Sequence, residues 1–205
     1  MDPFGGNMCG NFEVKATIKK VQKRFGLKLT PPIAHGPEMR PTDRILTIDG
    51  LSGQARGRLL GWGLRVAWDS KPLINARAES LIEKPTFRPL LQTRCLIPAS
   101  AYFEWQRPEG GAKQKMRIRP KGLAGDEPFA MAGLIGPDND TVTIITCTPA
   151  PDIATIHDRM PVILEPGGEM EWLNPKRLFP SVSNLLRPYA HDLDTENVDD
   201  HPVLF

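Results

Sequence analysis

Cys9 stands in the stretch GNMCGNF, and its chemistry depends on the residue that precedes it. If the mature chain starts at Cys9, one residue carries both a thiol and a free α-amine, which are two nucleophiles. The reference pKa of such an amine is about 8, so part of it is unprotonated near neutral pH. If Met8 stays attached, the same nitrogen is an amide and does not condense with an aldehyde. Three explanations of residues 1–7 stay open: translation that starts at Met8, self-cleavage before Cys9, and a permanent leader.

Glu104 lies between two aromatic residues in the stretch AYFEWQ. On a strand, Phe103 and Trp105 share one face, while Tyr102 and Glu104 share the other. A carboxylate packed among aromatic rings loses hydration, which raises its pKa toward neutrality and suits a general acid or base. The alternative is a glutamate that points to solvent at the edge of a sheet.

The stretch INARAES alternates polar residues with small ones. If it is extended, the polar residues line one face and the alanines pack beneath them. The polar residues are Asn75, Arg77 and Glu79. An asparagine amide beside an arginine suits an oxyanion or a phosphate, because both groups present directed N–H donors. The alternative is a structural Arg–Glu ion pair, which often contributes little to stability.

Two further stretches hold candidate residues. In TIHDRMPVIL, His157 is a natural proton carrier near neutral pH, and Arg159 beside it is a candidate phosphate ligand. The alternative is a buried structural histidine next to a surface arginine. In GWGLRVAW, we expect Trp62 to belong to the core and Trp68 to be an exposed platform that stacks on an unpaired base.

The elements that must position these residues are predicted to be mostly strands. The 21 prolines disfavour long helices, and turn-forming residues separate apolar runs that are typical of strands. Helical spacing of apolar residues from Val14 to Phe25 predicts a helix that ends at Gly26, and the stretch GGEMEWLNP predicts a second, short helix. We therefore predict a single α+β domain of mostly antiparallel strands with a barrel-like core and a few short helices.

Composition and charge narrow the class of protein. The 205-residue chain has a net charge of +2, but five acidic residues and no Lys or Arg follow Arg187. A basic body with an acidic end suits a polyanion partner. The alternatives are an ordinary solvated end and an acidic segment that covers a basic cleft. The chain has three cysteines without paired spacing, no zinc pattern, no signal peptide and no long apolar run, which together predict a cytoplasmic protein without disulfides or metal.

Several motifs, in their order along the chain, resemble the SRAP (SOS response-associated peptidase) family. They are MCGNF, GWGL with Trp68, NARAES, CLIPASAYFEW, AGLIG, TIITCTPA and IHDRMPVIL. The resemblance runs from Met8 to about Val198 and implies a compact β-rich domain with a basic cleft. We therefore expect residues 1–7 to be a leader or extension, residues 8–198 to be the domain, and residues 199–205 to be the C-terminal end.

The resemblance implies a reaction with abasic sites in single-stranded DNA. In the family, an N-terminal cysteine crosslinks covalently to the abasic sugar. Its amine condenses with the sugar aldehyde, and its thiolate then closes a thiazolidine ring. The matching catalytic positions are Cys9, Asn75, Glu104 and His157, and the matching phosphate ligands are Arg77 and Arg159. We expect no cofactor, no metal and no membrane partner, and we expect a monomer.

Two alternatives to crosslinking use the same residues. The first is a cysteine hydrolase in which Cys9, Glu104 and His157 cleave a peptide, such as the protein's own leader. The second is a module that keeps its leader and binds single-stranded DNA without chemistry. Asn11 also departs from the family, which usually has arginine there, so we expect a weaker phosphate contact near the nucleophile.

Overall fold

The computed structural model describes residues 10–28 and 38–199. The strands in the first half of this region are β1 (Asn11–Glu13), β2 (Arg44–Asp49), β3 (Arg56–Trp62), β4 (Leu64–Val66), β5 (Asp69–Leu73), β6 (Asn75–Arg77) and β7 (Arg94–Ala99). The later strands are β8 (Ala101–Gln106), β9 (Gln114–Pro120), β10 (Phe129–Ile135), β11 (Thr141–Cys147), β12 (Met160–Pro161), β13 (Ile163–Leu164) and β14 (Leu193–Asn197).

The helical elements are short and fewer than the strands. They are the α-helices α1 (Ile18–Phe25) and α2 (Pro166–Leu173), with the 3₁₀ turns η1 (Ala78–Ser80), η2 (Arg88–Leu90), η3 (Phe179–Ser181) and η4 (Ser183–Leu185). Across the described residues, no helix has the length and apolar character that a membrane span needs.

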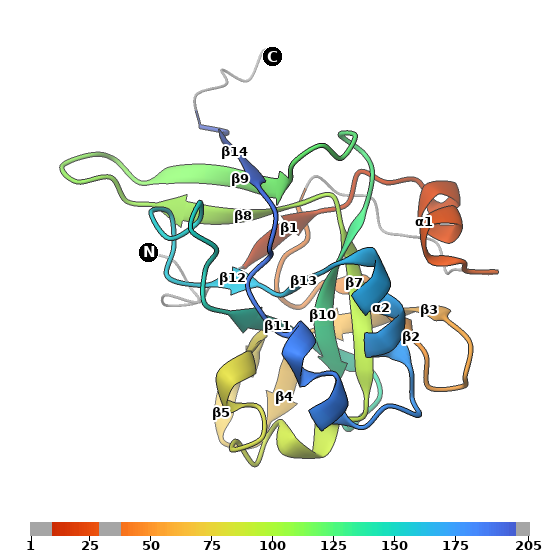
Figure 1. Cartoon of the computed structure of the whole chain (residues 1–205). Coiled ribbons are helices and arrows are strands. Elements are labelled where there is room, and N and C mark those ends of the chain that lie inside the picture. The colour runs from red at the N-terminus through yellow and green to blue at the C-terminus, as the bar shows by residue number, and fades with distance from the viewer. Residues whose placement is uncertain (1–9, 29–37, 200–205) are drawn as a thin grey trace.

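Five strands form a closed barrel in the order β11–β3–β2–β7–β10, with β10 pairing back to β11 (Figure 1). Strands β10 and β11 are buried along their whole length, which explains why β10 is continuously apolar and does not alternate with polar residues. The α+β fold with a barrel-like core is therefore confirmed. The barrel also contains a parallel pair, between β11 and β3, which the sequence did not predict.

A second sheet has the order β1–β8–β9–β14 and carries the stretch AYFEWQ on β8. Figure 1 shows β8 and β9 as a long hairpin at the top of the molecule. Tyr102 and Glu104 are 0% and 4% exposed, whereas Trp105 on the opposite face is 40% exposed. Phe103 is also buried on that outer face, where the Nζ of Lys115 lies 4.4 Å from its ring centroid. The expected alternation is present, and Glu104 is enclosed and does not point to solvent.

Helix α1 is shorter than its apolar spacing predicted. The helix starts only at Ile18, because Phe12 and its neighbours extend along β8 as strand β1. Thr17 caps the helix start, and its hydroxyl accepts an N–H from the first turn at 3.3 Å. Gly26 ends the helix with a φ of 65°, a conformation that glycine adopts without strain. The predicted end was therefore correct, and the predicted start at Val14 was wrong.

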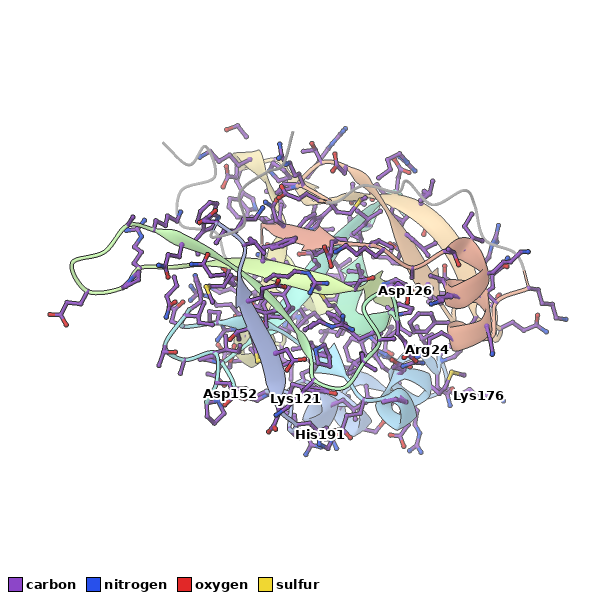
Figure 2. All side chains as sticks on the ribbon, turned by 90° about the horizontal axis from the view of Figure 1, so that it is seen from above. Arg24, Lys121, Asp126, Asp152, Lys176 and His191 are labelled. Atoms are coloured by element: carbon purple, nitrogen blue, oxygen red, sulfur yellow. The ribbon has the colours of Figure 1, made fainter. Side chains whose placement is uncertain are left out.

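Two arginines, one buried and one half-buried, hold helix α2 in place. The guanidinium of Arg94, which is 2% exposed, donates to the carbonyl oxygens of Trp172 and Asn174 at 2.7 and 2.8 Å. These carbonyls close the C-terminal end of the helix, where the main chain lacks its own partners. Arg24 of α1 makes two hydrogen bonds to Glu169 of α2, at 2.8 and 2.9 Å, and Figure 2 shows Arg24 between the two helices.

The acidic end of the chain forms an edge strand, β14, that the sequence did not predict. It pairs antiparallel with β9 over its full length. Asp192 contacts Lys121 at 3.2 Å, on the side of the molecule where Figure 2 labels Lys121. Glu196 contacts Arg117 of β9 at 3.6 Å. In the described part of the chain, the acidic end thus lies along a sheet edge, so the expectation that it covers a basic cleft is wrong for these residues.

Replacing Arg94 by methionine should lower the free energy of unfolding by about 3 kcal/mol, because it leaves several buried carbonyl oxygens without donors. Urea unfolding with linear extrapolation measures the change. Arg88→Met is the matched control, since Arg88 is exposed on η2, and it should change the free energy by less than about 0.5 kcal/mol. Equal effects of the two substitutions would contradict the role given to Arg94.

Candidate functional site

A groove of about 850 Å³ opens beside the β4–β5 hairpin, which lies at the lower left of Figure 1. Its walls include Trp68, Asn75, Arg77, Glu79, Thr148 and Arg159. The structure therefore brings together, in one groove, candidate residues from three separate stretches of the sequence.

Asn75 and Arg77 reach the groove because β6 pairs parallel with β11. The pairing sets Asn75 opposite Ile144 and Arg77 opposite Thr146. Ala76 between them is 1% exposed and packs into the core, as the alternation of the stretch predicted. Arg77 is exposed, and no hydrogen bond or ion pair engages its guanidinium within the described residues. Arg77 therefore presents all its donors to a ligand.

Arg159 is in a different state from Arg77, because Glu79 already holds it. The Nη1 and Nη2 atoms of Arg159 donate to the two carboxylate oxygens of Glu79, both at 2.7 Å. Nη2 also donates to the carbonyl oxygen of Thr146 at 2.9 Å. The guanidinium of Arg159 holds the pKa of Glu79 below its usual range. The ion pair that the sequence placed within the INARAES stretch thus forms instead with Arg159, leaving one Nη1 hydrogen of that arginine for a ligand.

His157 and Glu104 form a close pair, although they come from distant parts of the chain. The Nε2 atom of His157 lies 3.9 Å from the Oε2 atom of Glu104. This separation is too long for a direct hydrogen bond, so the contact between the two groups is electrostatic. The carboxylate side chain is 5% exposed and the imidazole is 22% exposed. An enclosed carboxylate beside a partly open imidazole is an arrangement suited to moving protons.

The surroundings of His157 favour its neutral form with the proton on Nε2. Burial lowers the pKa of the ring, and the nearby carboxylate of Asp158 opposes that effect. The backbone N–H of Arg159 donates to Nδ1 at 3.1 Å, which requires an unprotonated Nδ1. Asp158 Oδ1 lies 2.9 Å from the same Nδ1 and becomes its partner when the ring is protonated. In the neutral ring, the Nε2 proton therefore faces the side of Glu104.

The two tryptophans differ as the sequence predicted. Trp62 is fully buried, and its ring N–H donates to the carbonyl oxygen of Ile74 at 3.0 Å. Trp68 is 68% exposed at the tip of the β4–β5 hairpin and lines the groove. Gly63 turns the chain between them with a φ of 125°, and a Cβ there would lie 2.6 Å from Pro72. The hairpin that presents Trp68 therefore depends on glycine at this position.

The thiols of the described residues are poor nucleophiles. Burial raises the pKa of Cys147 to about 12 and raises that of Cys95 well above its usual range. A thiol reacts through its thiolate, so neither residue is activated near neutral pH. Cys9, the predicted nucleophile, lies outside the described residues. Among the described residues, no group of three or more His, Cys, Asp and Glu side chains is arranged to hold a metal ion.

Some residues of the site were not recognised from the sequence. Glu83, Lys84 and Thr148 line the groove, and the first two come shortly after the INARAES stretch, beyond Leu81 and Ile82. The nearness of Glu83 and Lys84 to that stretch in the sequence could have indicated that they lie beside the same groove. The partner of Glu79 had no such signal, because 80 residues separate it from Arg159.

The fold and the site define a single-domain protein with a mixed barrel, in which an enclosed carboxylate–histidine pair adjoins a groove that contains arginines. The profile of the family described as SOS response associated peptidase (SRAP) matches residues 8–202, and the chain belongs to this family. The resemblance drawn from the sequence motifs is therefore confirmed.

Relatives of the chain carry names that refer to abasic sites. The abasic site processing protein YoqW of Bacillus subtilis is 40% identical, over 93% of this chain and 92% of its own. The abasic site processing protein YedK of Escherichia coli is 28% identical, over 81% and 79%. The abasic site processing protein HMCES of Gallus gallus is 31% identical over 69% of this chain, which spans about half of the relative.

Solved structures share the fold. The crystal structure of a protein from Bacteroides thetaiotaomicron is similar with a TM-score of 0.78 at 26% identity, over 94% of this chain and 93% of its own. A protein from Bordetella bronchiseptica has a TM-score of 0.75 at 23% identity, over 93% and 99%. The second likeness concerns the fold alone.

His157 should titrate below its usual pKa of about 6.5 in the folded protein, and Asp158→Asn should lower the value further, because that carboxylate favours the charged ring. The ring binds a proton more readily in the unfolded protein than in the folded one. The free energy of unfolding is therefore unaffected by this group above about pH 6.5, and it falls as the pH drops from there toward the pKa of the folded protein. NMR titration of the ring nitrogens measures both proteins. A midpoint above 6.5 in the wild type would show that burial does not dominate.

Proposed function

We propose that the protein binds single-stranded DNA that contains an abasic site and crosslinks to it covalently through Cys9. The observation that supports this most directly is the Glu104–His157 pair, which does not itself line the groove but is connected to it by the hydrogen bond from the N–H of groove-lining Arg159 to Nδ1 of His157. Membership of the SRAP family, with relatives named abasic site processing proteins, supports the same substrate. The protein would thereby protect or process the damaged site.

The position of β1 supports the choice of Cys9 as the nucleophile. Strand β1 runs antiparallel to β8 with Asn11 opposite Phe103, so the chain before Asn11 leads toward the level of Glu104. A chain that begins at Cys9 would therefore carry its amine and thiol near the acid–base pair.

The proposed reaction needs both nucleophiles of an N-terminal cysteine. The amine adds to the C1′ aldehyde of the opened sugar, and the adduct loses water to give an iminium ion. The thiolate then adds to the same carbon and closes a five-membered thiazolidine ring. One water molecule is released overall, and no redox step or cofactor is needed.

The polar residues of the site have separate roles in this proposal. Glu104 accepts and returns protons while the sugar opens and the iminium forms. His157 first takes up a proton, and the resulting imidazolium delivers a proton from Nε2 to the ring oxygen of the sugar or to the departing hydroxyl group. Asn75 orients the amine or a developing oxyanion by hydrogen bonds. Removal of the protein's own leader would need the same acid–base pair and stays a prediction.

The groove would hold the DNA through its backbone and one base. Arg77 binds a flanking phosphate with its whole guanidinium, and Arg159 adds the one Nη1 hydrogen that Glu79 leaves. Trp68 stacks on a neighbouring base. Such contacts give salt-dependent affinity without sequence preference. We propose a monomeric, cytoplasmic protein for this role.

A chain verified by mass to start at Cys9 should form a heat-stable band with an oligonucleotide that carries one abasic site. Cys9→Ala should abolish the band, and Glu104→Gln should slow its formation by about 100-fold because a proton acceptor is lost. Denaturing gel electrophoresis over time measures the rate constant. Cys147→Ala is the control and should crosslink normally, since that thiol is buried and not ionised. The absence of a band with the verified wild type would refute crosslinking.

Arg77→Ala should weaken binding to undamaged single-stranded DNA and reduce the slope of log Kd against log salt by about 0.7, the value for one lost phosphate contact. Fluorescence anisotropy at several salt concentrations measures the slope. Arg56→Ala removes the same charge from an exposed position on β3, outside the groove, and should leave the slope unchanged. A common slope for the two variants would show that the groove is not the DNA site.

A further inference from the structure

We propose that Glu79 is a positioning residue that, through Arg159, holds the ring of His157 with Nε2 toward Glu104. The argument uses a continuous series of contacts that starts on η1 and ends at the candidate acid–base pair. The expected effect on the crosslinking rate rests on the proposed function, whereas the expected effect on the histidine ring does not.

The first part of the series is the ion pair between Glu79 and Arg159. Its two parallel hydrogen bonds are both 2.7 Å long, which is the short, bidentate geometry of strong charge-assisted contacts. The arginine side chain is 12% exposed, so the pair is partly shielded from water. Thr146 of β11 accepts a further hydrogen bond from Nη2, at 2.9 Å. Arg159 is therefore fixed against both η1 and the central strand of the barrel.

The second part connects Arg159 to the histidine ring through the backbone. The N–H of Arg159 donates to Nδ1 of His157 at 3.1 Å. Because the Arg159 side chain is fixed at its far end, its backbone N–H is held in place as well. A donor at Nδ1 places the ring proton on Nε2 and sets the direction of the ring. In this way a groove-lining carboxylate determines which nitrogen of the neutral histidine donates a hydrogen bond and which one accepts.

Charged groups on each neighbouring element also act on the ring. Glu104 faces Nε2 from β8 at 3.9 Å, and Asp158 faces Nδ1 from the same loop at 2.9 Å. Asp158 is 87% exposed and competes with the Arg159 N–H for Nδ1. If the Arg159 backbone moves away, Nδ1 can carry the ring proton and donate it in a hydrogen bond to the carboxylate of Asp158. The neutral ring then has no proton on Nε2. Glu79 would prevent this by holding the competing donor in place.

The proposal can be separated from a simple charge effect. If Glu79 acted only through its negative charge, its removal would lower the pKa of His157, because a favourable neighbour of the charged ring would be lost. If Glu79 acts by position, its removal lets the loop open and the ring gain water. The pKa then rises toward about 6.5, and the Nδ1–H tautomer becomes populated. The two explanations therefore predict opposite changes in the pKa of His157 when Glu79 is replaced.

The experiment is an NMR measurement of the ring nitrogens of His157 in wild type, Glu79→Gln and Glu79→Asp, without DNA. Wild type should show the Nε2–H tautomer. Both variants should show a mixture of tautomers and a raised pKa, because neither side chain can hold both Nη atoms in the wild-type geometry. Glu83→Gln is the matched control, since Glu83 is an exposed groove carboxylate, and it should retain the wild-type tautomer.

An unchanged tautomer in both Glu79 variants, or a lowered pKa in Glu79→Gln, would overturn the proposal. In crosslinking assays, Glu79→Gln should lower the rate constant at saturating DNA by about tenfold. Its affinity for undamaged DNA should be unchanged or tighter, because a negative charge has left the groove. Failure of the wild type to crosslink would refute the proposed function while leaving the NMR result on Glu79 intact.

Discussion

Strand β11 is the constraint on which the rest of the molecule depends. Within the described residues it pairs with β10 and β3, which closes the barrel, and with β6 and β12, which carry Arg77 and the residue after Arg159. All of its residues are buried, so its backbone groups need partners on both sides. The pairing that stabilises the core therefore also fixes the floor of the groove.

The sequence predicted those elements whose signals are local. The strands of the barrel have apolar runs and turn residues around them, and helix α1 ends at a glycine, so these features could be recognised directly. The assignment failed where tertiary pairing decides the structure. The helical spacing was read from Val14, but the chain just before it, Asn11–Glu13, extends along β8, and the helix starts only at Ile18. The polar strand β14 forms only because the open edge of β9 accepts it.

The residues of the site were predictable as types, but their partners were not. The alternation in INARAES gave the burial of Ala76 and the common face of Asn75 and Arg77, because it is a property of any strand. The pair between Glu79 and Arg159 depends on contacts between segments that are far apart in the sequence. Arg77 consequently keeps its donors for a ligand, whereas Arg159 serves mainly to order its surroundings. The sequence alone does not show this difference, because both residues are arginines.

Strand β14 has a consequence for self-association. An uncovered strand edge offers a row of backbone donors and acceptors to any other chain, and such edges are sites of aggregation. The edge of β9 is covered by five residues, of which Asp194 and Glu196 carry negative charge. A second molecule that presents the same edge meets like charge before hydrogen bonds can form. The acidic end thus places negative charge along the outer edge of this sheet, a feature that disfavours edge-to-edge pairing of two copies.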